Sequence, residues 1–260
     1  MSFNRMVQLY DETRVFDADC FDSALDFLTE RFPPTSFNKL FEPGLGTGRI
    51  AIPLAERGYR VTGVDISEEM LEVLNKRLLQ RKRALPISFH KADVMKLPFP
   101  DAVFDIAIAV HLFYFIRQWK KAVNEILRVL KQDGPLVLMH TGTGAEVPSL
   151  NARYKELCVE EGYSIKDVGV KSTSEVVDYL ANLGCHIEWI RDCWQWTQRI
   201  QLNRALHYIK SRAYSFTFPA PDKVHSRAID RLESELQHRF RDLSCEVEVP
   251  NQIYLVIVNQ

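Results

Sequence analysis

The sequence has few cysteines, and their spacing excludes two kinds of chemistry. Only five occur in 260 residues, an odd number, and no two of them form a CxxC pair. They are Cys20, Cys158, Cys185, Cys193 and Cys245. This arrangement offers neither a disulfide framework nor a zinc or iron–sulfur motif. We therefore expect no metal site and a reducing compartment.

The sequence also lacks a long apolar run and an excess of charge of either sign. The most apolar segment, residues 103–116, is too short to cross a membrane and contains Asp105. Acidic residues occupy the N-terminal region, where a secretory signal would need an apolar run. The 33 Lys and Arg residues nearly balance 34 Asp and Glu residues, so no overall field attracts nucleic acid or anionic lipid. We expect a cytoplasmic protein without a membrane span.

Between residues 37 and 140, short apolar runs alternate with amphipathic helical patterns. Such alternation is typical of consecutive βαβ units. The expected strands are residues 37–42, 60–64, 86–91, 103–109 and 135–140. Ser67 is predicted to cap one intervening helix, and a second begins near Trp119. The pattern predicts an α/β fold with a doubly wound, mostly parallel sheet.

After residue 140 the pattern changes. Helices are expected from Pro148 and, through a capping box of Ser172 with Glu175, up to about Gly184. Strands are expected at residues 187–198 and at the final "IYLVIV". Two helical patterns lie between these strands, where a hairpin would need only a few residues. We predict an N-terminal helical cover (residues 1–36), a core (37–200 and 243–260) and a helical cap (201–242).

The stretch "LFEPGLGTGRI" indicates a ligand-binding loop. Its three glycines, Gly44, Gly46 and Gly48, follow a strand and precede a helix, where backbone N–H groups and missing Cβ atoms let a ligand approach. A dinucleotide loop of the GxGxxG type would need glycine at Arg49. Asp65, at the end of the next strand, suits ribose hydroxyls in either cofactor class and does not decide between them.

Two further stretches decide the cofactor class. They are "KADVMKLPFPDAVFDIAIAVHLFYFI" and "WKKAVNEILRVLKQDGPLVL". From about residue 37 to 140 the chain resembles the class I S-adenosylmethionine (SAM)-dependent methyltransferases, in particular the type 11 group that includes ubiquinone and menaquinone biosynthesis enzymes. The resemblance implies a seven-stranded Rossmann-like sheet with an antiparallel last strand. The chain departs from the family's usual "DLGCGTG" at Pro43 and Leu45.

The resemblance also implies roles for individual residues. In the ExGxGxG loop, Glu42 and the three glycines would contact the methionine part of SAM. Asp65 would bind the ribose, and Asp93 the adenine amino group, with the backbone of Val94 meeting a ring nitrogen. Ile66 and Val110 are further expected cofactor contacts. The segment "QLYDETRVFD" resembles the family's leading segment, so Tyr10 would cover SAM and Arg14 would pair with its carboxylate. A solvated helix face is the alternative for this segment.

The acceptor side of the predicted site is less specific. His111 and His140 follow the fourth and fifth expected strands, which makes them candidates for a base or an orienting group. Ordinary packing or hydrogen bonding is the alternative for both. Tyr114 is a third candidate, because an aromatic face can line the methyl group, whereas core packing suits its neighbour Phe113 better. Late aromatic residues, including Tyr208 and Tyr214, fit either an apolar wall or ordinary packing.

The sequence therefore predicts a SAM-dependent methyltransferase (EC 2.1.1.-) that acts on a small molecule, as a monomer or homodimer. A tRNA- or RNA-modifying enzyme is the main alternative, because basic residues gather between residues 191 and 231, although acidic residues dilute them. The absence of an NPPY-type tetrapeptide disfavours methylation of the amino groups of adenine or of glutamine side chains. An NAD-dependent oxidoreductase is disfavoured by Arg49 and the Asp93 stretch. A non-catalytic SAM-binding protein stays open.

Overall fold

The strands of the protein form a seven-stranded mixed sheet. The structure is a computed structural model that describes residues 9–141 and 147–260. The strand order is β3-β2-β1-β4-β5-β7-β6, and β7 is antiparallel. The strands are β1 (Lys39–Pro43), β2 (Arg60–Asp65), β3 (Ile87–Lys91), β4 (Ile106–Val110), β5 (Leu136–Thr141), β6 (His186–Gln201) and β7 (Glu246–Asn259). The first five pair in parallel, so the predicted fold class is confirmed.

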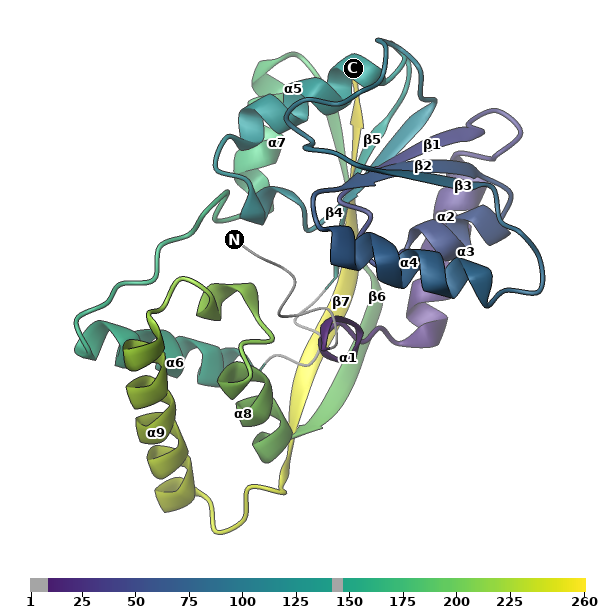
Figure 1. Cartoon of the computed structure of the whole chain (residues 1–260). Helices are drawn as coiled ribbons and strands as arrows, with labels where there is room; N and C mark the ends of the chain where they lie inside the picture. Colours follow the sequence, from purple (N-terminus) through teal and green to yellow (C-terminus); the bar gives the residue numbers. More distant parts are fainter. Residues whose placement is uncertain (1–8, 142–146) are drawn as a thin grey trace. The chain divides into compact units, whose positions relative to one another are not determined.

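Helices cover both faces of this sheet. In Figure 1, one face carries α2 (Ala18–Arg31), α3 (Ala51–Glu56) and α4 (Glu68–Leu79). The other face carries α5 (Trp119–Val129) and α7 (Thr173–Asn182). The remaining α-helices are α1 (Tyr10–Thr13), α6 (Pro148–Glu160), α8 (Leu202–Lys210) and α9 (Asp222–Arg239). Helices on both faces explain why β4 is a continuous apolar run, since neither face of that strand meets water.

The chain divides into two compact units. One unit, here called the sheet unit, comprises Ala18–His140, Val168–Trp194 and Ile253–Gln260. The other, here called the helical unit, comprises the chain up to Asp17, Thr141–Asp167 and Gln195–Gln252. Helices α8 and α9 lie between β6 and β7 in the chain, as the sequence predicts. The roles of cover and cap, with the boundaries predicted above, stay predictions.

Aromatic packing holds the core of the sheet unit together. Phe41 of β1 is fully buried and stacks on Phe104 with ring centroids 4.8 Å apart. Phe99 meets both rings edge-on. Burial of a phenylalanine side chain stabilises a fold by about 1.5–3 kcal/mol. Phe113 belongs to this core too, which confirms the packing interpretation for that residue.

The helical unit has an apolar core of its own. Its members come from α6, α8, α9 and the segments between them. Tyr208 and Tyr214 are almost completely buried in it, and Phe216 stacks on Tyr214. Ordinary packing therefore accounts for these late aromatic residues.

One predicted helix cap is confirmed and another is wrong. The Ser67 hydroxyl accepts a hydrogen bond from the Met70 N–H (3.3 Å) at the start of α4. The side chain of Ser172 makes no such bond at the start of α7. Instead the Glu175 carboxylate accepts from the Lys171 N–H (2.9 Å), one residue earlier than a capping box requires. The preceding segment explains the difference, because its N–H groups pair with the backbone of residues 113 and 114 and fix the path into α7.

This pairing makes Gly169 a test of the packing before α7. A Cβ atom at Gly169 would overlap the backbone oxygen of Phe113, so we expect Gly169→Ala to lower the free energy of unfolding by about 3 kcal/mol. Gly184, at the other end of α7, has positive φ but open space around it, so Gly184→Ala should cost only about 1 kcal/mol. Urea unfolding followed by tryptophan fluorescence would measure both. Equal losses would contradict the proposed backbone overlap.

Candidate functional site

The predicted site residues of the sheet unit follow the carboxyl ends of its parallel strands. Asp93 follows β3, Asp65 ends β2 and the glycine loop follows β1. Val110 ends β4, and His140 lies near the end of β5. Because the strand order is β3-β2-β1-β4-β5, the edge of the sheet presents two carboxylates, then the glycines, then the histidine region. In open α/β sheets, ligands bind outside this edge.

Different structural features explain the presence of glycine at the three positions of the loop. All have positive φ, at 71°, 55° and 79° for Gly44, Gly46 and Gly48. A Cβ atom at Gly44 would lie 2.8 Å from Leu112, and one at Gly48 would overlap Leu74. A Cβ atom at Gly46 would meet nothing within 4 Å. Packing therefore accounts for the first and third glycines, whereas the second leaves space in which a ligand can approach the backbone.

The Asp65 carboxylate joins the glycine loop to the start of α4. Its Oδ2 accepts from the Gly46 N–H (2.9 Å) and its Oδ1 from the Ser67 N–H (2.8 Å). Burial raises the pKa of Asp65, while hydrogen bonds from these two N–H groups and from that of Ile66 oppose the rise. Each carboxylate oxygen has two lone pairs, so Asp65 retains the capacity to accept ribose hydroxyls.

Glu42 is a buried carboxyl group that lacks a complete set of partners. Glu42 is only 2% exposed, and its Oε2 atom has no hydrogen-bond partner among the described residues. Burial, and then the charge of Asp65, raise the pKa of Glu42 well above its usual range. Leaving a buried polar group unpaired costs about 1–3 kcal/mol. A cationic ligand beside Glu42 would supply the missing partner.

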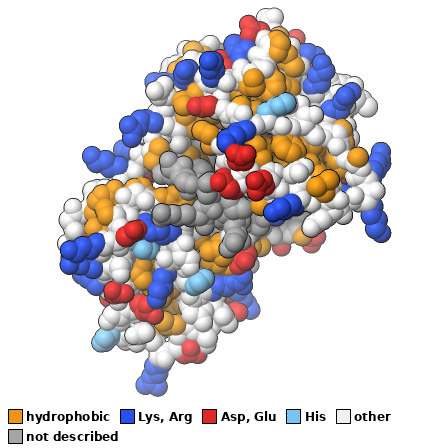
Figure 2. Space-filling view, viewed as in Figure 1, with side chains coloured by type: hydrophobic (Ala, Val, Ile, Leu, Met, Phe, Trp, Pro, Cys, Tyr) orange, Lys and Arg blue, Asp and Glu red, His pale blue; other side chains and the backbone are white. Residues whose placement is uncertain are grey.

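The surroundings of these two carboxyl groups are acidic and partly apolar. Helix α4 begins with Glu68 and Glu69, and Figure 2 shows acidic side chains gathered where Figure 1 places its start. Ile66, next to Asp65, is 63% exposed, although it is a large aliphatic residue. Such a side chain offers an apolar surface for a flat ring. This combination suits a ligand with a positive charge and an aromatic base.

Asp93 and Val94 complete this end of the site. The Asp93 Oδ1 atom accepts from the Met95 N–H (2.8 Å), which fixes the turn after β3. Val94 is buried in the core of the sheet unit, and Val110 is half-buried at the end of β4. The structure thus brings every predicted cofactor residue of the sheet unit to one edge.

The side chains of His111, Tyr114 and His140 form one cluster. They follow β4 and β5, the strands next to β1 and its glycine loop in the sheet. The His140 ring lies edge-on to the rings of His111 and Tyr114, with centroids 5.2 and 5.9 Å apart. His111 has a φ of 49°, which is uncommon for a residue with a side chain and is frequent at functional sites. His140 is buried, and burial lowers its pKa to about 4. His140 is therefore a neutral imidazole at physiological pH.

Sequence reasoning missed two members of this cluster, Thr173 and Tyr254. The Thr173 hydroxyl lies 3.1 Å from His140 Nε2, 3.2 Å from the Tyr114 hydroxyl and 3.0 Å from the Tyr254 hydroxyl. The Tyr254 ring stacks on His140 at 4.9 Å. Tyr254 carried one signal, since it is the only polar side chain in the apolar run "IYLVIV". Thr173 carried none beyond its place at a helix start.

Tyr10 and Arg14 belong to the helical unit. Tyr10 begins α1, and its side chain lies outside the described part of the structure. The Arg14 guanidinium donates a hydrogen bond to the Thr13 hydroxyl (2.7 Å). Their predicted contacts with SAM stay predictions.

The described residues 9–141 and 147–260 show neither a metal-binding cluster nor a membrane-spanning helix. They contain no group of three or more His, Cys, Asp or Glu side chains arranged to hold a metal ion. Among these residues, no helix has the length and apolar character needed to span a membrane.

Comparisons with known proteins agree with this geometry. A family model described as "Methyltransferase domain" matches residues 41–138. A demethylmenaquinone methyltransferase of Thermus thermophilus is 33% identical over 118 residues, which cover 45% of this chain and 51% of that protein. The chain thus spans about half the length of this curated relative.

Solved structures show the same fold over most of the chain. The YcgJ protein of Bacillus subtilis has a TM-score of 0.60 at 21% identity, covering 92% of this chain and 98% of that one. Phosphoethanolamine N-methyltransferase 2 of Haemonchus contortus, solved in complex with SAM, has a TM-score of 0.52 at 20% identity, covering 92% of this chain and 52% of that one. Residues 41–138 are thus similar to the methyltransferase domain family, and the solved structures show the same fold.

Proposed function

We propose that this protein transfers a methyl group from SAM to a small-molecule acceptor. The observation that carries the proposal is the site at the sheet edge, where the open Gly46 backbone adjoins Asp65 and the unpartnered Glu42 carboxyl. SAM, when bound, supplies a methyl group on a positively charged sulfur, which is a good leaving group. The fit is chemical, because SAM combines positive charge, a ribose and an adenine ring, and the site offers a partner for each.

The chain's residues divide the work of holding SAM. Glu42 and the glycine loop would hold its cationic methionine part, and Asp65 its ribose hydroxyls. Asp93 and the exposed Ile66 would bind the adenine. An oriented donor and acceptor in dry surroundings account for most of the catalysis that methyl transfer needs. Tyr10 and Arg14 are proposed to cover the bound SAM.

On the acceptor side, the geometry supports a division of roles among the predicted residues. His111 and Tyr114 are half-buried, so they are the groups that an acceptor can touch, with His111 as the proton acceptor where one is needed. His140 is a weak base because burial lowers its pKa to about 4. We assign it, with Thr173 and Tyr254, to positioning the Tyr114 hydroxyl.

The acceptor is proposed to be a metabolite or lipid-like molecule. The names of the relatives support this class, since one describes demethylmenaquinone and the other phosphoethanolamine as the methyl acceptor. A cytoplasmic location and a monomeric or homodimeric state complete the proposal.

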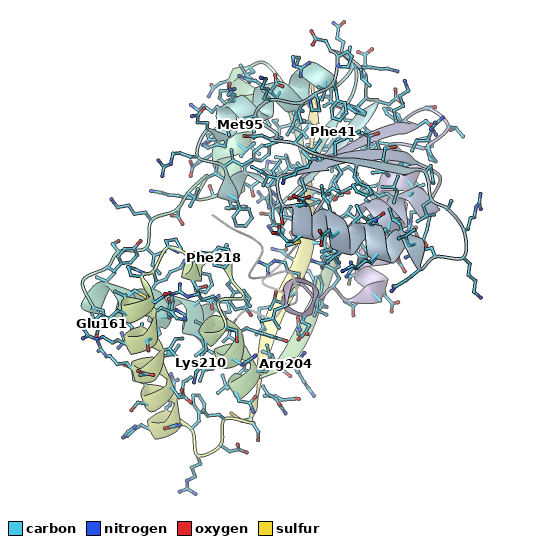
Figure 3. The ribbon with its side chains drawn as sticks, viewed as in Figure 1. Phe41, Met95, Glu161, Arg204, Lys210 and Phe218 are labelled. Carbon is cyan, nitrogen blue, oxygen red and sulfur yellow. The ribbon has the colours of Figure 1, made fainter. Side chains whose placement is uncertain are left out.

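The ion pairs of the helical unit disfavour the RNA alternative. Most of the basic residues that suggested RNA binding face a carboxylate within 4 Å, including Arg204 and Lys210, which Figure 3 places on α8. The others are Arg199, Arg212, Arg227 and Arg231. A surface that binds nucleic acid needs Lys and Arg charge in excess of carboxylate charge.

Transfer of a labelled methyl group would test the function directly. The protein would be incubated with a metabolite extract and SAM that carries an isotopic methyl label. We expect mass spectrometry to find the label in a product of low molecular mass. Label in RNA would favour the alternative enzyme, and SAM binding without any labelled product would indicate a non-catalytic protein.

Glu42→Gln would test the donor site. The amide has the size of the neutral acid, so we expect little change in stability but about 10- to 100-fold weaker SAM binding, because a charge-assisted contact is lost. A cation favours the carboxylate form, so SAM binding should release a proton, and wild-type affinity should rise with pH while Glu42 titrates. Calorimetry between about pH 5 and 7, below the titration of the SAM amino group, would measure both effects.

The control for this test is Glu72→Gln, which removes an exposed carboxylate of α4. It should leave the affinity and its pH dependence unchanged. If Glu42→Gln behaved as this control does, Glu42 would have no role in binding SAM.

Thr173→Val would test the positioning cluster. Valine keeps the shape and removes the hydroxyl, so we expect kcat to fall about tenfold while the affinity for SAM stays the same. Thr173→Ser should recover most of the turnover, because it retains the hydroxyl. Both variants would be assayed with the acceptor found by methyl labelling. Equal losses in both variants would instead assign the effect to the missing methyl or changed packing.

A further inference from the structure

Four side chains of the sheet unit stack on one another in a single row. His140 of β5 stacks on Tyr254 of β7 with ring centroids 4.9 Å apart, and Tyr254 stacks on Trp189 of β6 at 6.1 Å. The guanidinium carbon of Arg191, two residues further along β6, lies 3.7 Å from the centroid of the Trp189 ring. Because β5, β7 and β6 are neighbours in the sheet, this stacked row crosses three strands and joins Arg191 to the histidine cluster.

Arg191 carries a positive charge that no described carboxylate neutralises. Its side chain is exposed, and within residues 9–141 and 147–260 it forms no ion pair and no side-chain hydrogen bond. By contrast, Arg57 and Arg128 of the same unit each face two carboxylates. Stacking on a ring uses the flat face of a guanidinium, whereas its N–H groups lie at the edge. Arg191 therefore keeps its capacity to donate hydrogen bonds.

The charge of Arg191 acts on the hydroxyl groups beside His140. Burial raises the pKa of Tyr254, whereas its hydrogen bond with Thr173 and the positive charge of Arg191 oppose the rise. The Thr173 hydroxyl lies 3.0 Å from the Tyr254 hydroxyl and 3.2 Å from that of Tyr114. Tyr114 is one of the groups assigned above to contact with the acceptor. An acceptor that touches Tyr114 thus has a fixed positive charge nearby.

Trp189 orients the Arg191 guanidinium. The tryptophan is half-buried and packs against the apolar core of the sheet unit, so its ring is a fixed support. A cation is attracted to the face of a tryptophan ring. An arginine that is oriented before a ligand arrives loses less side-chain freedom on binding it. The support and the unpaired charge together suit recognition of an anion.

We propose that Arg191 binds an anionic group of the methyl acceptor and so determines which acceptors the protein takes. The inference rests on the methyl transfer proposed above. The anion is a carboxylate or a phosphate, because both match the donor fork of arginine. It is separate from the atom that receives the methyl group, which lies near His111 and Tyr114. The edges of the stacked row offer an apolar surface to the part of the acceptor in between.

Binding of simple anions to the full chain would test the proposal without turnover. The probes are benzoate, phenyl phosphate and benzamide, which has the shape of benzoate but no charge. Ligand-detected NMR titrations would measure the three affinities. We expect at least one of the anions to bind about tenfold more tightly than benzamide, because a charge-assisted contact is gained. The anion that binds more tightly identifies the group as a carboxylate or a phosphate.

Two variants would assign this preference to Arg191. Arg191→Gln should remove it, so that the anions bind no more tightly than benzamide. The control is Arg60→Gln, which removes an exposed arginine at the start of β2, the end of that strand opposite Asp65. Arg60 likewise forms no ion pair among the described residues, and its loss should change the preference less than about twofold. Thermal unfolding would confirm that both variants are folded.

The acceptor found by methyl labelling provides a second readout. We expect it to carry an acidic group, and we expect Arg191→Gln to raise its KM about tenfold while kcat and the affinity for SAM stay unchanged. A purely structural role of Arg191 would not produce this separation of KM from kcat.

Three results would overturn the proposal. They are equal binding of all three probes to the wild-type protein, equal effects of Arg191→Gln and Arg60→Gln, and an acceptor without an acidic group. Failure of the proposed function would look different. Binding of an anion that depends on Arg191, without any labelled product, would support the anion site and contradict methyl transfer.

Discussion

The hydrogen bonds of the Asp65 carboxylate are the interaction on which the site depends. One oxygen binds the Gly46 N–H and the other the Ser67 N–H, so a single side chain at the end of β2 fixes the loop after β1 and the entry to α4. Ser67 in turn caps α4 through its hydroxyl. The positive φ of Gly46 is thereby maintained at a position where nothing packs against it. The hydrogen bond between Gly46 and Asp65, and not side-chain packing, therefore keeps the space beside Gly46 open for a ligand.

The same carboxylate also contributes to the raised pKa of its neighbour Glu42. Glu42 is buried one strand away, and burial together with the charge of Asp65 raises its pKa. A buried acid in this state costs free energy, since one of its oxygens has no partner among the described residues. A positive group beside Glu42 would offset that cost. The Glu42 carboxyl group therefore has fewer partners in the free protein than in a complex with a cation. This difference favours binding of a cation.

The local parts of this design were predictable from the sequence, and the tertiary parts were not. Alternating apolar runs gave the parallel sheet, and the strand ends then placed Asp65 and Asp93 at one edge. Which glycine leaves open space depends on Leu112 and Leu74, whose positions the loop sequence does not contain. Thr173 reaches the histidine cluster from a segment beyond residue 140, outside the part of the sequence that resembles the methyltransferases. The capping box failed for a similar reason, because pairing with residues 113 and 114 sets the path into α7.

The two ends of the site differ in charge, and the difference matches the chemistry proposed for it. The donor end contains carboxyl groups that suit a cation, whereas His140, Thr173, Tyr114 and Tyr254 form a neutral hydrogen-bonded cluster. His140 stays neutral because burial lowers its pKa to about 4, so the cluster keeps its charge state across the physiological range. Methyl transfer to a neutral nucleophile spreads positive charge over more atoms as the bond forms. Surroundings that hold one end of the reactants by charge and leave the other end dry and neutral favour such a transition state.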